Sequence, residues 1–328
     1  MHTELMDELT GFRKKEWTDL LERTGLDADA HTEKTALIWD EQRLVAAGSR
    51  QRNILKCIAV DPSHQGEDLT ATLLTHLRQD AFSQGYRHLF LYPKPENSIR
   101  FSSLFFYPVV QTENVLLMEN VKDGVRQFLA GLETPCKKGR IGSIVMHCNP
   151  FTRGHRYLIE SAAKQCTHLY VFILSEEQSI FPAAHRLELV KAGTADLKNV
   201  TVLPTGHYLI SAATFPSYFI KDKSRAGEIF CQLDIAVFLR YFVPHFGINC
   251  RFVGTEPSCR VTARYHNALA ASLPKAGVDL TVIPRLEENG TPISASTVRK
   301  LLEKRSMDEI TGLVPECTLA YLKKRNLI

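Results

Sequence analysis

The sequence predicts a two-domain α/β protein, in which an α+β half precedes a half built on a parallel sheet. At 328 residues the chain exceeds the ~250 at which a single core stops growing, so two cores are expected. Apolar residues alternate along the first half before a helical stretch, whereas short apolar strands alternate with helices in the second half.

The first half, residues 1–130, starts with an amphipathic helical segment. The stretch 35–60, TALIWDEQRLVAAGSRQRNILKCIAV, alternates in polarity and contains β-branched residues, which predicts antiparallel strands. A helix is predicted next, because Leu69, Leu73, Leu74 and Leu77 share one helical face. HLFLY predicts a strand, SIRFSSLFFY a short helix and NVLLME a final strand, an order typical of an α+β domain.

A linker is predicted at residues 131–140, GLETPCKKGR, between segments of different pattern. In residues 141–328, the strands IGSIVM, HLYVFILS and VTVLPT are separated by helical stretches, and CRFVGTEP and LTVIPRL predict two later strands. SASTVRKLLEKR predicts a helix after the last strand. This alternation predicts a Rossmann-like parallel sheet, whose ligands bind beyond the carboxyl ends of the strands.

Composition argues against several classes of protein. The formal net charge of +4 and the dispersed basic residues do not suggest a nucleic-acid surface. We expect no secretory signal and no membrane span, because the N-terminus lacks an apolar core and no run of about 18 apolar residues occurs. The eight cysteines form no CxxC pair, so we expect reduced thiols and a cytoplasmic protein.

The stretch NPFTRGHRYLIE, residues 149–160, follows the first strand of the predicted parallel sheet. Pro150 stiffens the loop, and Gly154 lets the backbone approach a ligand closely. Amides and the helix dipole favour an anion at the start of the helix, where His155 can donate to phosphate oxygens. For the histidine taken alone, a turn with a surface histidine is the alternative.

NPFTRGH resembles the HxGH signature of the nucleotidylyltransferase superfamily, with Thr152 replacing the first histidine, and ISASTVRK at 293–300 resembles its ISSTxxR motif. The resemblance implies an ATP site in which His155 and Arg299 are catalytic. The residues that it implies for binding ATP or its phosphates are Asn149, Pro150, Phe151, Thr152, Gly154, His155, Gly254, Glu256, Ser294, Ser296 and Arg299.

Several of these side chains have a second interpretation. Ser294 suits a helix N-cap, and Arg299 either presents a charged fork to phosphate or is a solvated helix residue. Gly254 and Glu256 either contact the nucleoside or end a strand. HRLELV resembles the helix that often follows the second strand in the superfamily, and Arg186 either belongs to that pattern or is an exposed helical residue.

The segment GHYLISAATFPSYFIKDKSR, residues 206–225, lies between the two motifs. Lys221 and Lys223 either neutralise the leaving pyrophosphate or are surface lysines. Tyr218 either helps to wall a pocket for a small acid, as a possible phosphate or acetate contact, or packs in the core.

In the first half, IAVDPSHQGEDLTATLL resembles the pyrophosphate-gripping strand, loop and helix of the GNAT acetyltransferase fold. Gln65 and Gly66 fit the usual opening, but Asp68 stands where a small residue is expected and should repel pyrophosphate. Asn97 and Tyr107 are possible contacts on the thiol side. Three interpretations of this half stay open. It contains a working acyl-CoA site, it contains a site adapted to a related pantetheine carrier, or its fold has only a structural role.

The whole chain resembles the citrate lyase ligase family, in the order of its two halves and in NPFTRGH, TFPSYF, FVGTEP and ISAS. The resemblance implies an AMP- and diphosphate-forming acid–thiol ligase. ATP, as its Mg²⁺ complex, and acetate form acetyl adenylate, and the acetyl group passes to a dephospho-CoA-derived prosthetic thiol. That group is carried by the acyl carrier (gamma) subunit of citrate lyase. We assign no metal to protein side chains.

Two other functions stay open from the sequence. One is a nucleotidylyltransferase that makes a dinucleotide cofactor by adenylyl transfer to a phosphate acceptor. The other is a binding or regulatory protein that has lost turnover, against which His155, Gly154 and Arg299 argue.

Overall fold

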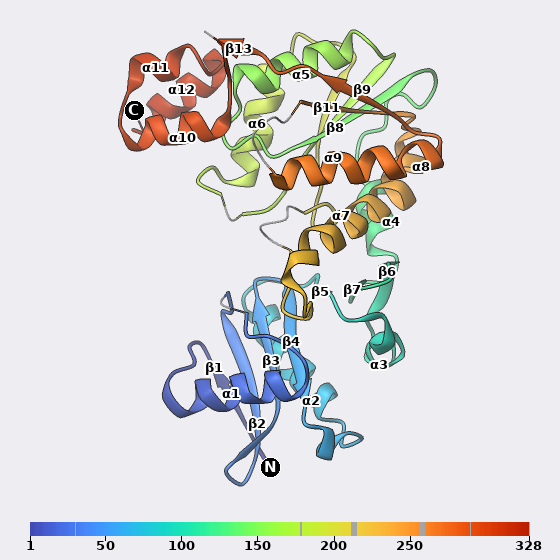
Figure 1. The fold of residues 1–328 in the computed structure, drawn as a ribbon, viewed down its shortest axis with the longest axis vertical. Helices are drawn as coiled ribbons and strands as arrows, with labels where there is room; N and C mark the ends of the chain where they lie inside the picture. The colour runs from blue at the N-terminus through green and yellow to red at the C-terminus, as the bar shows by residue number, and fades with distance from the viewer. Residues whose placement is uncertain (30, 178, 211–214, 256–259, 289, 328) are drawn as a thin grey trace. The chain divides into compact units, whose positions relative to one another are not determined.

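The computed structural model describes residues 1–328 except 30, 178, 211–214, 256–259, 289 and 328. The chain divides into two compact units (Figure 1). Unit 1 contains Met1–Gly124 and Phe215–Leu233, and unit 2 contains Val125–Thr214 and Asp234–Ile328. The segment Phe215–Leu233, which sequence order places in 141–328, therefore packs with the first half.

Unit 1 contains a seven-stranded sheet in the order β1-β2-β3-β4-β5-β7-β6. Its elements are β1 (His2–Met6), α1 (Gly11–Arg23), β2 (Lys34–Asp40), β3 (Arg43–Gln51), β4 (Ile54–Val60), α2 (Leu69–Ser83), β5 (Phe90–Leu91), α3 (Ser98–Ser102), β6 (Tyr107–Gln111) and β7 (Leu116–Glu119). The expectation of a helical start is wrong for the first residues, because β1 pairs antiparallel with β2 before α1 begins.

The core of unit 1 lies between the sheet and α2. Leu69, Leu73, Leu74 and Leu77 are buried, as their shared helical face predicts, and they pack against alternate strand residues such as Ile38. β4 and β5 are joined by a parallel pairing of only two residue pairs, Ile54 with Phe90 and Leu55 with Leu91. Residues beyond this pairing line a cavity, which is described below.

Unit 2 contains a five-stranded parallel sheet in the order β10-β9-β8-β11-β12. Its elements are α4 (Gly124–Ala130), β8 (Ile141–Met146), α5 (Arg153–Ala163), β9 (His168–Ile173), α6 (Ala183–Gly193), β10 (Val200–Pro204), η4 (Phe238–Phe242), α8 (Val243–Phe246), β11 (Cys250–Gly254), α9 (Arg260–Ser272), β12 (Asp279–Ile283), β13 (Glu287–Glu288), β14 (Thr291–Pro292), α10 (Ala295–Glu303), α11 (Met307–Thr311) and α12 (Glu316–Lys324). Helix α7 (Ala226–Val237) runs from one unit into the other.

Helices cover both faces of the parallel sheet. Ile159 of α5 and Leu189 of α6 join one buried cluster with the strands, whereas Phe242 and Phe246 contact the ring of Phe172 from the other face. Strands covered on both faces are apolar throughout, which explains the continuous runs in the sequence.

One helical stretch, Lys223–Phe246, is apolar and long enough to cross a bilayer by length and composition. Of its most apolar window, 61% is buried inside the protein. Phe238, Phe242 and Phe246 within this stretch are 0% exposed, as in a core helix.

Candidate active site

A cavity of about 810 Å³ lies at the carboxyl ends of β8, β11 and β12. β8 is the central strand of the sheet. The next strand in the sequence, β9, lies on one side of β8, and the later strand β11 lies on its other side. Ligands of open parallel sheets bind at such switch points. Five residues that the sequence predicts for ATP line this cavity, namely Gly154, His155, Gly254, Ser294 and Ser296.

Thr152 and His155 form a reciprocal cap at the start of α5. The Thr152 hydroxyl accepts from the His155 amide at 3.3 Å, and the Thr152 amide donates to His155 Nδ1 at 3.1 Å. Since an amide can only donate, Nδ1 carries no proton in this arrangement. The proton of the neutral ring is therefore on Nε2, which can donate to a ligand. Phe151 stacks on the ring, with centroids 6.2 Å apart.

The pKa of His155 is lowered to about 4 by burial and, to a smaller extent, by the positive charge of Arg285 and by His147. The imidazole is thus neutral at physiological pH. A neutral donor at a helix N-terminus suits a group that bonds phosphate without exchanging a proton.

The two predicted motifs meet at the cavity. Arg299 Nη1 donates to the Asn149 carbonyl at 2.5 Å, and Arg299 Nη2 donates to the Ser296 hydroxyl at 3.2 Å. A Cβ on Gly154 would lie 2.8 Å from the Ile293 carbonyl oxygen, so glycine is needed for close approach of these two backbones. In this structure Arg299 contacts protein groups and ties α10 to the loop after β8.

Four residues predicted to bind ATP form that loop and are buried in it: Asn149, Pro150, Phe151 and Thr152. The Asn149 amide oxygen accepts from the Phe181 amide, and the Phe151 carbonyl accepts from the Thr318 hydroxyl. These hydrogen bonds hold the loop that leads into Gly154 and His155 at the start of α5.

The remaining predicted residues at this site differ in placement. Ser294 is the N-cap of α10, and its hydroxyl accepts from the Thr297 amide at 3.1 Å. Gly254 ends β11, and a Cβ there would meet only ordinary contacts. Glu256 lies outside the described residues.

Arg186 is fully buried, so the alternative of an exposed helical residue is wrong. Its guanidinium donates to the carbonyls of Phe181 at 3.0 Å, His147 at 2.7 Å, Leu174 at 2.8 Å and Glu176 at 2.5 Å. Burial lowers its pKa. These carbonyls follow β8 and β9, so Arg186 fixes the loops at the carboxyl edge of the sheet.

Sequence reasoning missed three cationic side chains that line the cavity, Arg251 in β11, Arg285 after β12 and Lys300 in α10. A signal for Arg285 was present, because it lies near the carboxyl end of the predicted strand LTVIPRL. These charges favour an anionic ligand.

Lys221, Lys223 and Tyr218 belong to unit 1, because the segment that carries them packs there. The ammonium group of Lys223 pairs with Asp27 at 2.5 Å and donates to the Ser217 carbonyl. Tyr218 is 8% exposed, and the amide of Asp27 donates to its carbonyl at 2.8 Å.

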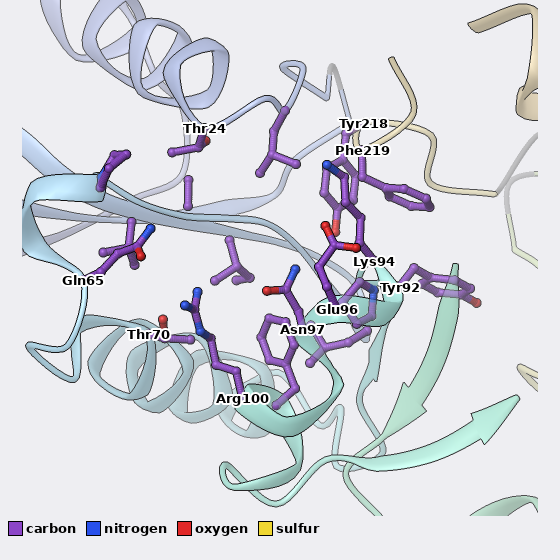
Figure 2. Close-up of a pocket in the computed structure, with 18 of the residues that line it drawn as sticks. Thr24, Gln65, Thr70, Tyr92, Lys94, Glu96, Asn97, Arg100, Tyr218 and Phe219 are labelled. Atoms are coloured by element: carbon purple, nitrogen blue, oxygen red, sulfur yellow. The ribbon is translucent and has the colours of Figure 1, made fainter. Parts of the chain in front are cut away.

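A second cavity, of about 340 Å³, lies in unit 1 where β4 and β5 separate. Figure 2 shows that Gln65 and Asn97 line it from different elements, with Tyr218 and Phe219 at another wall. Gly66, φ 99°, belongs to the loop before α2, and Tyr107 starts β6; neither is among the described lining residues.

Asp68 has a left-handed backbone, φ 54°, just before α2, and its side chain makes no capping hydrogen bond. Glycine adopts this conformation without the Cβ penalty, so Asp68→Gly should raise the free energy of unfolding of unit 1 by about 0.5–1 kcal/mol. Urea unfolding measures this. Glu67→Gly, at the neighbouring exposed residue, is the matched control and should not stabilise. An equal change in the free energy of unfolding for both variants would contradict backbone strain at Asp68.

The described residues contain no group of three or more His, Cys, Asp or Glu side chains that could hold a metal ion. Seven cysteines are described, and all are free thiols.

Comparisons with known proteins cover both units. A family model described as "Citrate lyase ligase C-terminal domain" matches residues 141–322, and one described as "Acetyltransferase (GNAT) family" matches residues 2–104. These matches confirm the predicted GNAT-like half and the parallel-sheet nucleotidylyltransferase half.

Two relatives that match along most of both chains support the same assignment. A citrate (pro-3S)-lyase ligase of Klebsiella pneumoniae is 40% identical, covering 90% of this chain and 89% of the relative. One of Escherichia coli is 39% identical, covering 94% and 90%. A phosphopantetheine adenylyltransferase of Streptococcus equi is 24% identical, covering 57% of this chain and 95% of the relative. The chain therefore belongs to the citrate lyase ligase family and is an enzyme of that family.

Proposed function

We propose that the chain activates acetate with ATP as acetyl adenylate and then transfers the acetyl group to a thiol on citrate lyase. The names of the relatives support citrate lyase as the target. The thiol would be that of the dephospho-CoA-derived prosthetic group on the acyl carrier (gamma) subunit. The reaction is expected in the cytoplasm.

The observation that carries this proposal is the geometry around His155. Its Nδ1 is engaged by the Thr152 amide, and its Nε2 proton is available at the start of α5, within the 810 Å³ cavity. The helix dipole, Arg285 and Lys300 add positive potential around the same space. We assign the triphosphate to this end of the cavity.

In the first step, a carboxylate oxygen of acetate bonds to the α-phosphorus and the bond to pyrophosphate breaks. No protein nucleophile is needed, so alignment and positive charge supply the catalysis. Mg²⁺ would enter with ATP, held by phosphate oxygens and water. In the second step, the thiolate bonds to the acetyl carbon, AMP leaves and the thiol proton passes to solvent.

Unit 1 is proposed to receive the carrier thiol. Its 340 Å³ cavity between β4 and β5 contains Gln65 and Asn97, which suits a pantetheine-like arm. The GNAT family match supports a coenzyme-A-like ligand there. Adenylation is accordingly assigned to unit 2 and thiol delivery to unit 1.

Product analysis tests the proposal. The chain is incubated with MgATP, acetate and deacetylated citrate lyase, and the products are separated. We expect AMP, pyrophosphate and an acetyl thioester on the carrier subunit. A stable dinucleotide formed from a phosphate acceptor would instead support the adenylyltransferase alternative. The similarity to the Streptococcus equi phosphopantetheine adenylyltransferase is the reason to test for it.

A further inference from the structure

Arg251 is the second of the five residues of β11, in the interior of unit 2, and it is 2% exposed. Its neighbours Cys250 and Phe252 join the cluster under α5, so strand alternation places Arg251 on the opposite face. There it lines the 810 Å³ cavity together with Val145, Val253 and Tyr265. This part of the cavity has no role in the nucleotide site described above.

The guanidinium of Arg251 is incompletely satisfied. Its Nη2 donates to the Tyr265 hydroxyl at 3.4 Å, and its carbon lies 4.3 Å from the centroid of the Phe238 ring. Within the part of the chain that the structure describes, Nε and Nη1 are buried without a hydrogen-bond partner. A buried charge lacking such partners costs several kcal/mol, so the fold has reason to supply a partner from outside.

Asp234 is not the missing hydrogen-bond partner of the Arg251 guanidinium. The Tyr265 hydroxyl donates to Asp234 Oδ2 at 2.5 Å, and no ion pair within 4.0 Å joins Asp234 to Arg251 among the described residues. Burial raises the pKa of Asp234 to about 6, although Arg251 and Tyr265 act in the opposite direction. Tyr265 thus separates the acid from the guanidinium.

We propose that Arg251 binds the carboxylate of the small acid substrate, with its alkyl group against Val145 and Val253. A carboxylate only accepts hydrogen bonds and carries a full negative charge, so one of its oxygens on Nε or Nη1 would supply both an acceptor and a counter-charge to this guanidinium. The apolar valine side chains favour a short alkyl group over a second charge. This inference rests on the proposed adenylation, because it names the acid subsite of the same cavity.

Substitution of Arg251 tests the subsite by steady-state kinetics. Arg251→Met should raise the KM for acetate by roughly 10- to 100-fold in pyrophosphate exchange and leave the KM for ATP within about twofold. Arg251→Lys keeps the charge but loses the fixed guanidinium donors, so its KM for acetate should fall between those of the unmodified chain and Arg251→Met. Arg240→Met is the matched control, because Arg240 is exposed and lies over the Tyr241 ring in the same helical stretch as Phe238. It should leave both constants unchanged.

A binding measurement on the unmodified chain separates this inference from the proposed function. The ¹⁵N–¹H signal of Arg251 Nε, identified by its loss in Arg251→Lys, should shift on titration with sodium acetate and not with sodium chloride. Acetate-dependent exchange with an unmoved signal and an unchanged acetate KM in Arg251→Lys would overturn the inference alone. A shifted signal without any acetate-dependent exchange would retain the subsite and overturn the adenylation.

Discussion

Replacement of His155 by alanine is expected to lower the rate of acetate-dependent pyrophosphate exchange by roughly 10²-fold or more. The ring is stacked on Phe151 and capped by the Thr152 amide, so its Nε2 proton is held in place before the substrate arrives. Alanine removes both the donor and the cap on that amide. Because transition-state charge develops on the phosphates, the loss should fall mainly on kcat.

Thr152→Val tests the cap, because it removes the hydroxyl that caps the His155 amide and lies 3.0 Å from Nδ1, while it keeps the ring and the Thr152 amide that donates to Nδ1. It should cost stability, by about 1 kcal/mol, with a much smaller loss of rate. A His155→Ala enzyme of ordinary thermal stability and near-normal rate would remove His155 from the site.

The pH dependence follows from the lowered pKa of His155. With a pKa of about 4, the ring stays neutral from pH 8 down to about 5, so it should add no inflection near pH 6.5 to the rate. The unfolded chain, in contrast, binds a proton as the pH falls below 6.5. The free energy of unfolding therefore decreases between pH 6.5 and 4, and His155→Ala should lessen that decrease.

Replacement of Arg186 by methionine is expected to lower the stability of unit 2 by about 3–5 kcal/mol. The substitution removes donors from four carbonyls in the loops after β8 and β9 and in the segment before α6, and it leaves those carbonyls buried. Because these loops position His147 and the residues leading to His155, ATP affinity should fall as well. Urea unfolding and nucleotide titration measure the two effects.

Lys191→Met is the matched control, because Lys191 is an exposed cation on the same helix. It should change stability by no more than about 0.5 kcal/mol. If Arg186→Met were as mild as this control, the four bonds would not organise the loops.

Much of the fold could be predicted from the sequence, because strands buried on both faces produce uninterrupted apolar runs. The strands near 141, 168, 200, 250 and 280 all occur, in one parallel sheet. β1 was missed because its five residues are ordered by pairing with β2, which local propensity does not reveal. The packing of Phe215–Leu233 with unit 1 is likewise tertiary, since its aromatic residues could join either core.

The site was only partly predictable. The motifs indicated His155 and Gly154 because helix starts and glycines have local signatures, and both line the cavity. The motif also indicated Arg299, whereas Arg186 had two interpretations, and only the folded loops reveal that both side chains bind carbonyls. Arg251 carried a signal that was passed over, since a charge inside a buried strand calls for a partner.

The formation of acetyl adenylate is tested most directly by exchange of labelled pyrophosphate into ATP, with Mg²⁺ and without citrate lyase. The first step is complete without the thiol, so exchange should occur when acetate is present and stop when acetate is omitted. Exchange that is equally fast without acetate, or absent with it, would contradict the proposed mechanism.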